Sequence, residues 1–313
     1  MRKLVALASA VLMTVGVAAC GSSGGSTANT TTTTAGGTTT TAASSTTTVA
    51  PLECNGSPAS VTDVGQASDF TPVVADTLTI VTSLPGPGFF EGSDTDPTQI
   101  TSGFEYDLAK AMQAEFGLKS LVVRNENFDT ITGGTATKYD LALSQISITC
   151  DRAKVVDFSV PYFYSNQGVL VSSTFTQPIT TLAEAKKVRW GVQSSTTAID
   201  LLDKLKPDTD PKVFPQLPDA YAALQAGQVD AILIDTAINL GEAARSKGTF
   251  KVVAQFSQTD GPDQYGAILP KGSTNAAAVN AVLTDLQTSG KLGELATQDL
   301  TVDPGTIPTI NLP

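Results

Sequence analysis

The stretch from residue 144 to residue 164 combines the side chains best suited to hold an anion. It reads SQISITCDRAKVVDFSVPYFY. Its hydroxyl groups and turn amides offer short hydrogen bonds, and Arg152, three residues after a threonine, offers a planar guanidinium that grips two oxygens at once. The pattern indicates a carboxylate-binding turn. Taken alone, an ordinary surface turn with a solvated arginine would explain it as well.

The elements before this stretch follow the rhythm of a parallel α/β sheet. An apolar, β-branched run at 78–83 predicts a strand, and LVV at 121–123 predicts another. Between them a helix is expected over 103–118, because its large apolar residues recur every four positions. Ser102 and Glu105 have the spacing of a capping box at the start of that helix.

A second α/β set follows the stretch. A strand is expected at 187–193, and the hydroxyl-rich run 194–197 opens a helix through 205, whose first free amides form a second anion cradle. The apolar strand 229–234 ends at Asp235, and ligands in open α/β sheets gather at the carboxyl ends of strands. Further strands at 250–256 and 264–269 and a helix at 276–290 complete the chain, followed by a tail expected to wrap a surface.

This order predicts two lobes of α/β structure with a cleft between them. The last elements return to the first set, so two extended crossings, near 168–173 and 252–257, would join the lobes. A cleft with such a hinge suits closure on a small ligand.

The first fifty residues have the features of an exported, lipid-anchored protein. Arg2 and Lys3 precede an apolar run at 4–19, which suits a signal peptide (1–19) better than a membrane-spanning helix. The run ends VAAC, which resembles the bacterial lipobox and predicts acylation of Cys20; a plain signal peptide with a chance cysteine is the alternative. Residues 20–50 carry no charge and many threonines, which predicts a disordered tether between membrane and domain.

Composition limits the chemistry of the folded part. A formal net charge of −11 argues against binding nucleic acid and against lying on anionic lipid. The absence of histidine excludes Ser-His-Asp and Cys-His catalysis and histidine-ligated metals, and we expect neither a metal nor a cofactor. Cys54 and Cys150 remain as an even pair, which in an exported protein favours a disulfide; a free, buried Cys150 is the alternative.

Four blocks of the sequence, in order, resemble the bacterial extracellular solute-binding proteins of the polar amino-acid type (family 3). They are GFEYDLAKAM, SITCDRAKVVDFSVPYFYS, GVQSSTTA and VDAILIDTA, with Tyr106 and Ser195 at positions where an aliphatic residue and glycine are usual. The resemblance covers 78–298. It implies a two-lobe, type II periplasmic-binding-protein-like α/β fold, each lobe a mixed, mostly parallel sheet flanked by helices, with a two-strand hinge. Lobe 1 is expected at 51–170 and 257–313, and lobe 2 at 171–256.

The resemblance also implies roles for individual residues. Arg152 would clamp the α-carboxylate of a ligand and Asp235, from the opposite lobe, would take its α-ammonium, since a buried zwitterion needs a partner at each end. Alternatives stay open: Asp235 could cap the next helix, a core position would explain Phe128, and a plain helix cap would explain Thr196 or Thr197. The residues expected to assist are Ser147, Thr196, Thr197, Gln145 through a carbonyl, and Phe128 and Phe89 as aromatic covers.

The resemblance therefore implies a receptor, not an enzyme. It would be an extracytoplasmic monomer, held to the membrane by its lipid anchor alone, that delivers a polar amino acid to the permease of an ABC importer. An amino-acid sensor signalling to a membrane partner and a dehydratase-like enzyme on the same scaffold are the alternatives. The ligand is expected to be Glu, Gln, Asp or Asn, because Arg124, Lys138 and Arg189 could meet an acidic side chain, and Asn125, Asn127 and Gln145 an amide.

Overall fold

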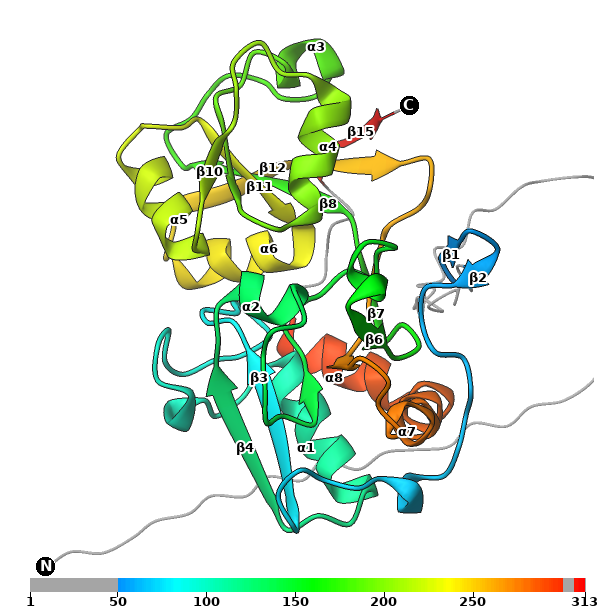
Figure 1. Cartoon of the computed structure of the whole chain (residues 1–313). Coiled ribbons are helices and arrows are strands. Elements are labelled where there is room, and N and C mark those ends of the chain that lie inside the picture. Colours follow the sequence, from blue (N-terminus) through cyan, green and yellow to red (C-terminus); the bar gives the residue numbers. More distant parts are fainter. Residues whose placement is uncertain (1–49, 301–306, 313) are drawn as a thin grey trace, which may run out of the picture. The chain divides into compact units, whose positions relative to one another are not determined.

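The computed structural model describes residues 50–300 and 307–312, which carry two larger sheets and two short two-stranded ones within one compact unit (Figure 1). The predicted signal peptide, Cys20 and the predicted tether up to residue 49 lie outside the described residues. No helix within the described ranges has the length and apolar character that a membrane crossing requires.

The first sheet is mixed and is flanked by helices on both faces. Its order is β4 (Ser120–Asn125), β3 (Thr77–Thr82), β5 (Leu141–Ala142), β14 (Ile268–Pro270) and β6 (Val156–Phe158), with β14 antiparallel to its neighbours. The helices α1 (Phe104–Glu115), α7 (Ala276–Thr288) and α8 (Lys291–Asp299) pack against one another, and α2 (Phe128–Thr132) contacts β3. The fully buried Ile80, Leu108 and Met112 join strand and helix in one core.

The second sheet repeats this architecture. Its order is β10 (Lys212–Phe214), β9 (Trp190–Gln193), β11 (Ala231–Asp235), β8 (Gln167–Ser172), β12 (Phe250–Gln258) and β15 (Thr309–Leu312), and β8 runs antiparallel to both neighbours. Its helices are α3 (Leu182–Ala185), α4 (Thr197–Leu205), α5 (Leu217–Gln225) and α6 (Thr236–Arg245). The two α/β lobes expected from the sequence are therefore present.

A short antiparallel pair joins the two sheets. β7 (Phe163–Ser165) leads from β6 to β8, and β13 (Asp263–Tyr265) leads from β12 to β14. The crossings expected at 168–173 and 252–257 were misplaced, because those segments form β8 and β12 inside the second sheet. Their apolar residues serve burial in a central strand and not the passage between lobes.

The end of the chain differs from the expected lobe boundaries. Residues 257–313 were all expected in lobe 1, yet β15 pairs in parallel with residues 255–258 of β12 at the edge of the second sheet. The alternation in TINL explains this, since Ile310 and Leu312 are buried while the residues between them are exposed.

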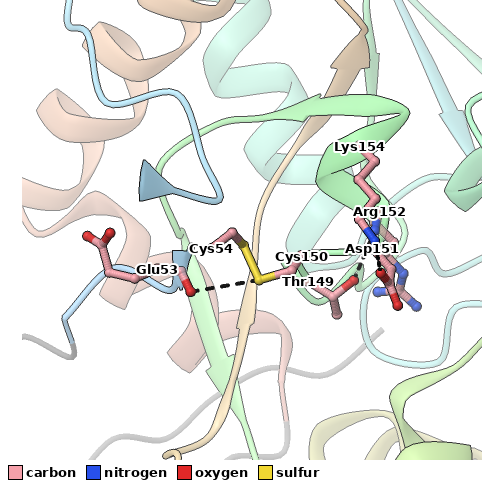
Figure 2. Close-up of a disulfide and its surroundings, with 7 residues drawn as sticks. All are labelled: Glu53, Cys54, Thr149, Cys150, Asp151, Arg152 and Lys154. Carbon is pink, nitrogen blue, oxygen red and sulfur yellow. Dashed lines mark hydrogen bonds and ion pairs between the residues drawn. A yellow bond between two sulfur atoms is a disulfide. The ribbon is translucent and has the colours of Figure 1, made fainter. Parts of the chain in front are cut away.

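A disulfide ties the start of the described chain to the predicted anion-binding turn. β1 (Glu53–Cys54) and β2 (Ser57–Pro58) form a small hairpin, and Cys54 is bonded to Cys150, 96 residues away in sequence. Figure 2 shows this bond beside Thr149 and Arg152, whose backbone amide donates to the Thr149 hydroxyl. The predicted pairing is present, and the alternative of a free Cys150 is not.

The predicted capping box at the start of α1 is wrong. Gly103 holds the N-cap position at φ 114°, and no side chain caps the helix. A Cβ at Gly103 would lie 2.5 Å from the carbonyl oxygen of Phe89, so glycine is required there. The carboxylate of Glu105 turns into the protein instead, where it is fully buried.

Candidate functional site

The main candidate site is a cavity of about 460 Å³, its opening to solvent included, that both lobes line. The first lobe contributes the loop after β3 and the turns after β5, and the second contributes the starts of α4, α5 and α6. These are carboxyl ends of strands or helix starts, where polar backbone groups are left free. The lining residues are Ser83, Leu84, Pro85, Phe128, Ser144, Gln145, Ser147, Arg152, Gln193, Thr196, Thr197, Gln216, Leu217, Ile234, Asp235 and Ile238.

Arg152 provides the positive charge of this cavity. Its side chain is 9% exposed and stacks over the ring of Phe128 at 5.4 Å. The guanidinium donates to the carbonyl oxygens of Ser147 at 2.6 Å and Ser195 at 2.7 Å, so it contacts both lobes through neutral acceptors. Burial lowers the pKa of Arg152 to about 10, partly opposed by nearby aspartates. The group stays cationic at neutral pH and lacks a directly bonded anion among the described residues.

The start of α4 faces the same space. Thr196 is the N-cap residue, but its hydroxyl donates to the carbonyl of Gln193 at 2.8 Å and does not cap the helix. Ser195, which stands where the family has glycine, adopts φ 61° just before it. The hydroxyl of Thr197 lies 3.2 Å from Asp263 and 3.1 Å from Gln167. Both threonines line the cavity, and no side chain makes a capping hydrogen bond at the start of α4.

Asp235 provides the negative charge from the second lobe. It ends β11 and occupies the N-cap position of α6, yet its side chain makes no capping hydrogen bond. The side chain is 4% exposed, and its Oδ1 atom has no hydrogen-bond partner among the described residues. Burial and the neighbouring charge of Asp263 raise the pKa of Asp235 well above its usual range. The hydroxyl of Tyr265 opposes this shift, and the Oδ1 atom is left for a further donor.

Asp263 is a second, half-buried carboxyl group that the sequence interpretation missed. It opens β13 in the hinge and accepts from Gln167 and Thr197. Burial raises its pKa, while those hydrogen bonds and Arg152 act in the opposite direction. It does not line the main cavity, so we interpret it as a partner that fixes the start of α4. The one signal for Asp263 in the sequence was its position as a charged residue directly before the apolar run 264–269.

The remaining predicted residues, with one exception, also lie at the cavity. Ser147 and Phe128 line it, and Phe128 begins α2 with its ring beneath Arg152. Gln145 lines it with a left-handed backbone at φ 51°. Phe89 is the exception: it is fully buried and packs edge-on against Phe104 and Phe163. The prediction that Phe89 covers a ligand is therefore wrong, because the loop after β3 turns its phenylalanines into the core.

The charged residues considered for recognition of an acidic ligand lie elsewhere. Arg124 donates to the carbonyls of Thr137 and Lys138 and pairs with Glu126, away from the cavity. Arg189 is paired with Asp230 at 2.5 Å. Within the described ranges, the ionisable side chains lining the cavity are those of Arg152 and Asp235.

The amide groups considered in the sequence divide in the same way. Asn125 accepts from the backbone amide of Leu84, and Asn127 accepts from Gln216 at 3.0 Å, so both serve as structural supports. Gln145 lines the cavity, together with Gln193, which lies in the block GVQSSTTA but was not named as a candidate, and Gln216, which lies in none of the four blocks. Their positions depend on which lobe surfaces meet, and that is not visible in local sequence.

The two lobes also contact each other through residues that do not line the cavity. Ser194 donates to Asp129 at 3.0 Å, and Arg245 pairs with Asp94 at 2.6 Å. Gly241 of α6 approaches the backbone of Pro87 so closely that a Cβ at position 241 would lie 2.5 Å from the Pro87 carbonyl oxygen. The lobes therefore enclose the cavity with direct contacts on more than one side.

These groups together suit a small dipolar molecule. A cationic fork and a carboxyl group, contributed by different lobes, face one enclosed space that is otherwise lined by neutral side chains. A ligand with a carboxylate and an ammonium would supply the missing counter-charge at each end. No cluster of three or more metal-ligating side chains occurs in the described part of the chain.

Comparison with known proteins agrees with this geometry. The family described as bacterial extracellular solute-binding proteins, family 3, matches residues 90–298, which confirms the resemblance seen in the four blocks. The ABC transporter glutamine-binding protein GlnH of Bacillus subtilis (strain 168) is 30% identical over 235 residues, which is 74% of this chain and 81% of that protein. The L-cystine-binding protein TcyJ of Escherichia coli (strain K12) is 26% identical over 223 residues, 70% of this chain and 81% of the other.

Solved structures give the same result. A structure titled as an ancestral arginine-binding protein bound to glutamine is 27% identical, with a TM-score of 0.63, and the match covers 72% of this chain and 98% of the other. The expected two-lobe, type II α/β fold is thereby confirmed. The three proteins named here are all described as binding proteins.

Proposed function

Because the chain belongs to the bacterial extracellular solute-binding proteins of family 3, we propose that it captures a polar amino acid and delivers it to an ABC importer. Members of an extracellular family work outside the cytoplasm, so the site faces an extracytoplasmic space. The amino acid would bind as a zwitterion between the lobes. Attachment through Cys20, and a permease as the membrane partner, are part of this proposal.

One observation carries the proposal: Arg152 and Asp235 line the same cavity from different lobes. Arg152 would bind the α-carboxylate through its free N–H groups, with the amides at the start of α4 beside it. Asp235 would accept the α-ammonium at its unpartnered oxygen. A ligand held at both ends is stabilised only while the lobes are together, so binding favours closure.

The ligand we propose has a neutral side chain. The other lining groups are carboxamides, hydroxyls and apolar residues, and the basic residues considered for an acidic ligand lie outside the cavity. An unpaired ligand charge in this space would lack a counter-charge and would be costly to bury. Of the four amino acids expected from the sequence, glutamine and asparagine therefore fit better than glutamate and aspartate.

Calorimetric titration of the purified protein with the twenty amino acids tests the function. We expect glutamine or asparagine to bind most tightly, and glutamate, aspartate, lysine and arginine to bind at least about tenfold more weakly, since each adds an uncompensated charge. Absence of binding to every amino acid would contradict the proposed function. Tightest binding of a charged amino acid would keep the receptor function and refute the neutral side chain.

Closure of the lobes gives a prediction at a residue remote from the charges. Gly241→Ala should weaken amino-acid binding about tenfold, because the new Cβ would meet the backbone of Pro87 at 2.5 Å and hold the lobes apart. Gly293→Ala is the matched control, since it also adds a methyl group within a helix, but into open space. Equal affinity of the two variants in calorimetry would show that the Gly241 contact is unnecessary for binding.

A further inference from the structure

Glu105 is a buried acidic residue behind the cavity, and it pairs with neither Arg152 nor Asp235. Glu105 of α1 is fully buried and accepts three hydrogen bonds. The backbone amide of Gln145 donates to its Oε1 at 2.8 Å, and the hydroxyl of Tyr162 donates to the same atom at 2.5 Å. The side-chain Nε2 of Gln145 donates to its Oε2 at 2.5 Å. Two of the three donors therefore belong to one residue of the cavity wall.

These contacts fix Gln145 in both its backbone and its side chain. Its φ of 51° is costly for a residue other than glycine, and the hydrogen bond from its amide to Glu105 offsets that cost. The side chain lies against Gly86, where a Cβ would be 3.4 Å from Nε2 and 3.6 Å from Oε1. Because residue 86 is glycine, no side chain at that position of the loop after β3 covers the carboxamide of Gln145.

The orientation of the carboxamide follows from Glu105. Burial raises the pKa of Glu105 to about 7, while the hydrogen bonds from Tyr162 and Gln145 favour its ionised form. When Glu105 is ionised, its oxygens accept and cannot donate, so it draws the NH₂ end of Gln145 toward itself and turns the carbonyl end away. That carbonyl oxygen has no hydrogen-bond partner among the described residues, although Gln145 lines the cavity. The carbonyl oxygen of Gln145 therefore gives the cavity wall an uncharged hydrogen-bond acceptor with a fixed direction.

We propose that Gln145, oriented by Glu105, recognises the side chain of the bound amino acid by accepting a hydrogen bond from its N–H group. This inference rests on the proposed amino-acid receptor and adds the property it selects: a side chain that is neutral and donates a hydrogen bond, as a carboxamide does. Glutamate offers only acceptors when ionised, and methionine offers no N–H donor, so neither satisfies the Gln145 oxygen. Glu105 acts through Gln145 and is a positioning residue.

The test measures selectivity with three probes, L-glutamine, L-methionine and L-glutamate, by calorimetry. In the wild type we expect glutamine to bind most tightly. Gln145→Ala should reduce the ratio of glutamine to methionine affinity about five- to tenfold, the worth of one neutral hydrogen bond, while methionine affinity changes little. If Gln145 served only the backbone of the turn, all three probes would weaken together and the ratio would stay constant, which would overturn the inference.

Glu105→Gln gives the sharper result. A glutamine at position 105 would keep its oxygen beside the Gln145 amide and Tyr162, and would place its NH₂ where Oε2 now accepts. Gln145 would then turn its own oxygen toward position 105 and its NH₂ toward the cavity. We expect the glutamine-to-glutamate affinity ratio to fall about tenfold or more. An unchanged ratio in a folded variant would contradict the role of Glu105.

Tyr162→Phe is the matched control. It removes a donor to Glu105 but leaves the Oε2 contact that orients the carboxamide, so the selectivity ratios should stay within about twofold of the wild type. If Glu105→Gln does not fold, Gln145→Ala still decides the question. Failure of the wild type to bind these probes and every other amino acid would refute the proposed function; binding of glutamine with unchanged ratios in Gln145→Ala would refute this inference alone.

Discussion

Arg152→Ala should weaken binding of glutamine or asparagine at least about 100-fold, the largest loss we expect from a single substitution. The variant leaves the ligand carboxylate buried without a counter-charge, and removal of one partner of a buried charge pair costs about 3–5 kcal/mol. The affinity of Arg152→Lys should fall between those of the wild type and Arg152→Ala, because an ammonium keeps the positive charge but lacks the planar fork of the guanidinium. Calorimetric titration measures all three proteins.

Two comparisons separate this effect from a general loss of structure. Arg124→Ala removes a guanidinium that pairs outside the cavity, so its affinity for the amino acid should be unchanged. The decarboxylated analogue of glutamine, 4-aminobutanamide, should bind wild type and Arg152→Ala about equally, since it has no carboxylate to lose. If Arg152→Ala weakened both compounds alike, its contact with Ser195, and not the carboxylate, would explain the loss.

Asp235→Asn should be the second most damaging change, and its effect should depend on pH. Burial and Asp263 raise the pKa of Asp235 in the empty site, while a bound ammonium would lower it. Wild-type affinity should therefore rise with pH until Asp235 is ionised in the free protein, and binding below that point should release a proton. Asp235→Asn should bind about 100-fold more weakly at high pH and lose most of this pH dependence.

Titrations between pH 5 and pH 8, in buffers of different ionisation enthalpy, measure the released proton directly. Asp230→Asn is the control, because Asp230 pairs with Arg189 at the surface and its pKa is lowered. The pKa of Asp263, which lies near Asp235, is also raised. Any pH dependence of affinity that remains in Asp235→Asn is therefore assigned to Asp263. Proton release of equal size in wild type and Asp235→Asn would show that Asp235 does not receive the ammonium.

Asp235→Asn should also stabilise the empty protein against unfolding near neutral pH. A raised folded pKa means that the folded state binds its proton more tightly than the unfolded state does. The stability of the empty wild type therefore falls as pH rises from the unfolded value near 3.8 through the folded value of Asp235. An asparagine cannot ionise, so a thermal melt at pH 7 should show a higher midpoint for the variant. A lower affinity together with a higher melting temperature would indicate that Asp235 serves binding at a cost in stability.

Local sequence predicted the parts of the site that depend on residue type and spacing. Arg152 after a hydroxyl-rich turn, and Asp235 at the end of an apolar strand, are visible because strand, turn and charge follow one another in the chain. The disulfide followed from the parity of Cys54 and Cys150. All of these are contacts or positions that a short segment or a residue count determines.

The errors arose where a local pattern competes with long-range packing. Ser102 and Glu105 have capping-box spacing, but Glu105 is drawn into the core by Gln145, 40 residues away. Phe89 follows a turn-forming loop, yet its ring packs in the core against the buried ring of Phe104 and the half-buried ring of Phe163. Gln216 lies in none of the four blocks, because only the meeting of the two lobes makes it a neighbour of the cavity.

The edge strand β15 has a mechanical consequence. α8 packs with α1 on the first lobe, whereas β15 completes the sheet of the second, so the polypeptide passes from one lobe to the other three times: through β7, through β13, and between α8 and β15. A pair of strands alone permits both bending and twisting. β15 is hydrogen-bonded to residues 255–258 of β12, shortly before β13, so it braces the strand that enters this crossing. That bracing favours bending over twisting when the lobes part to admit or release a captured molecule.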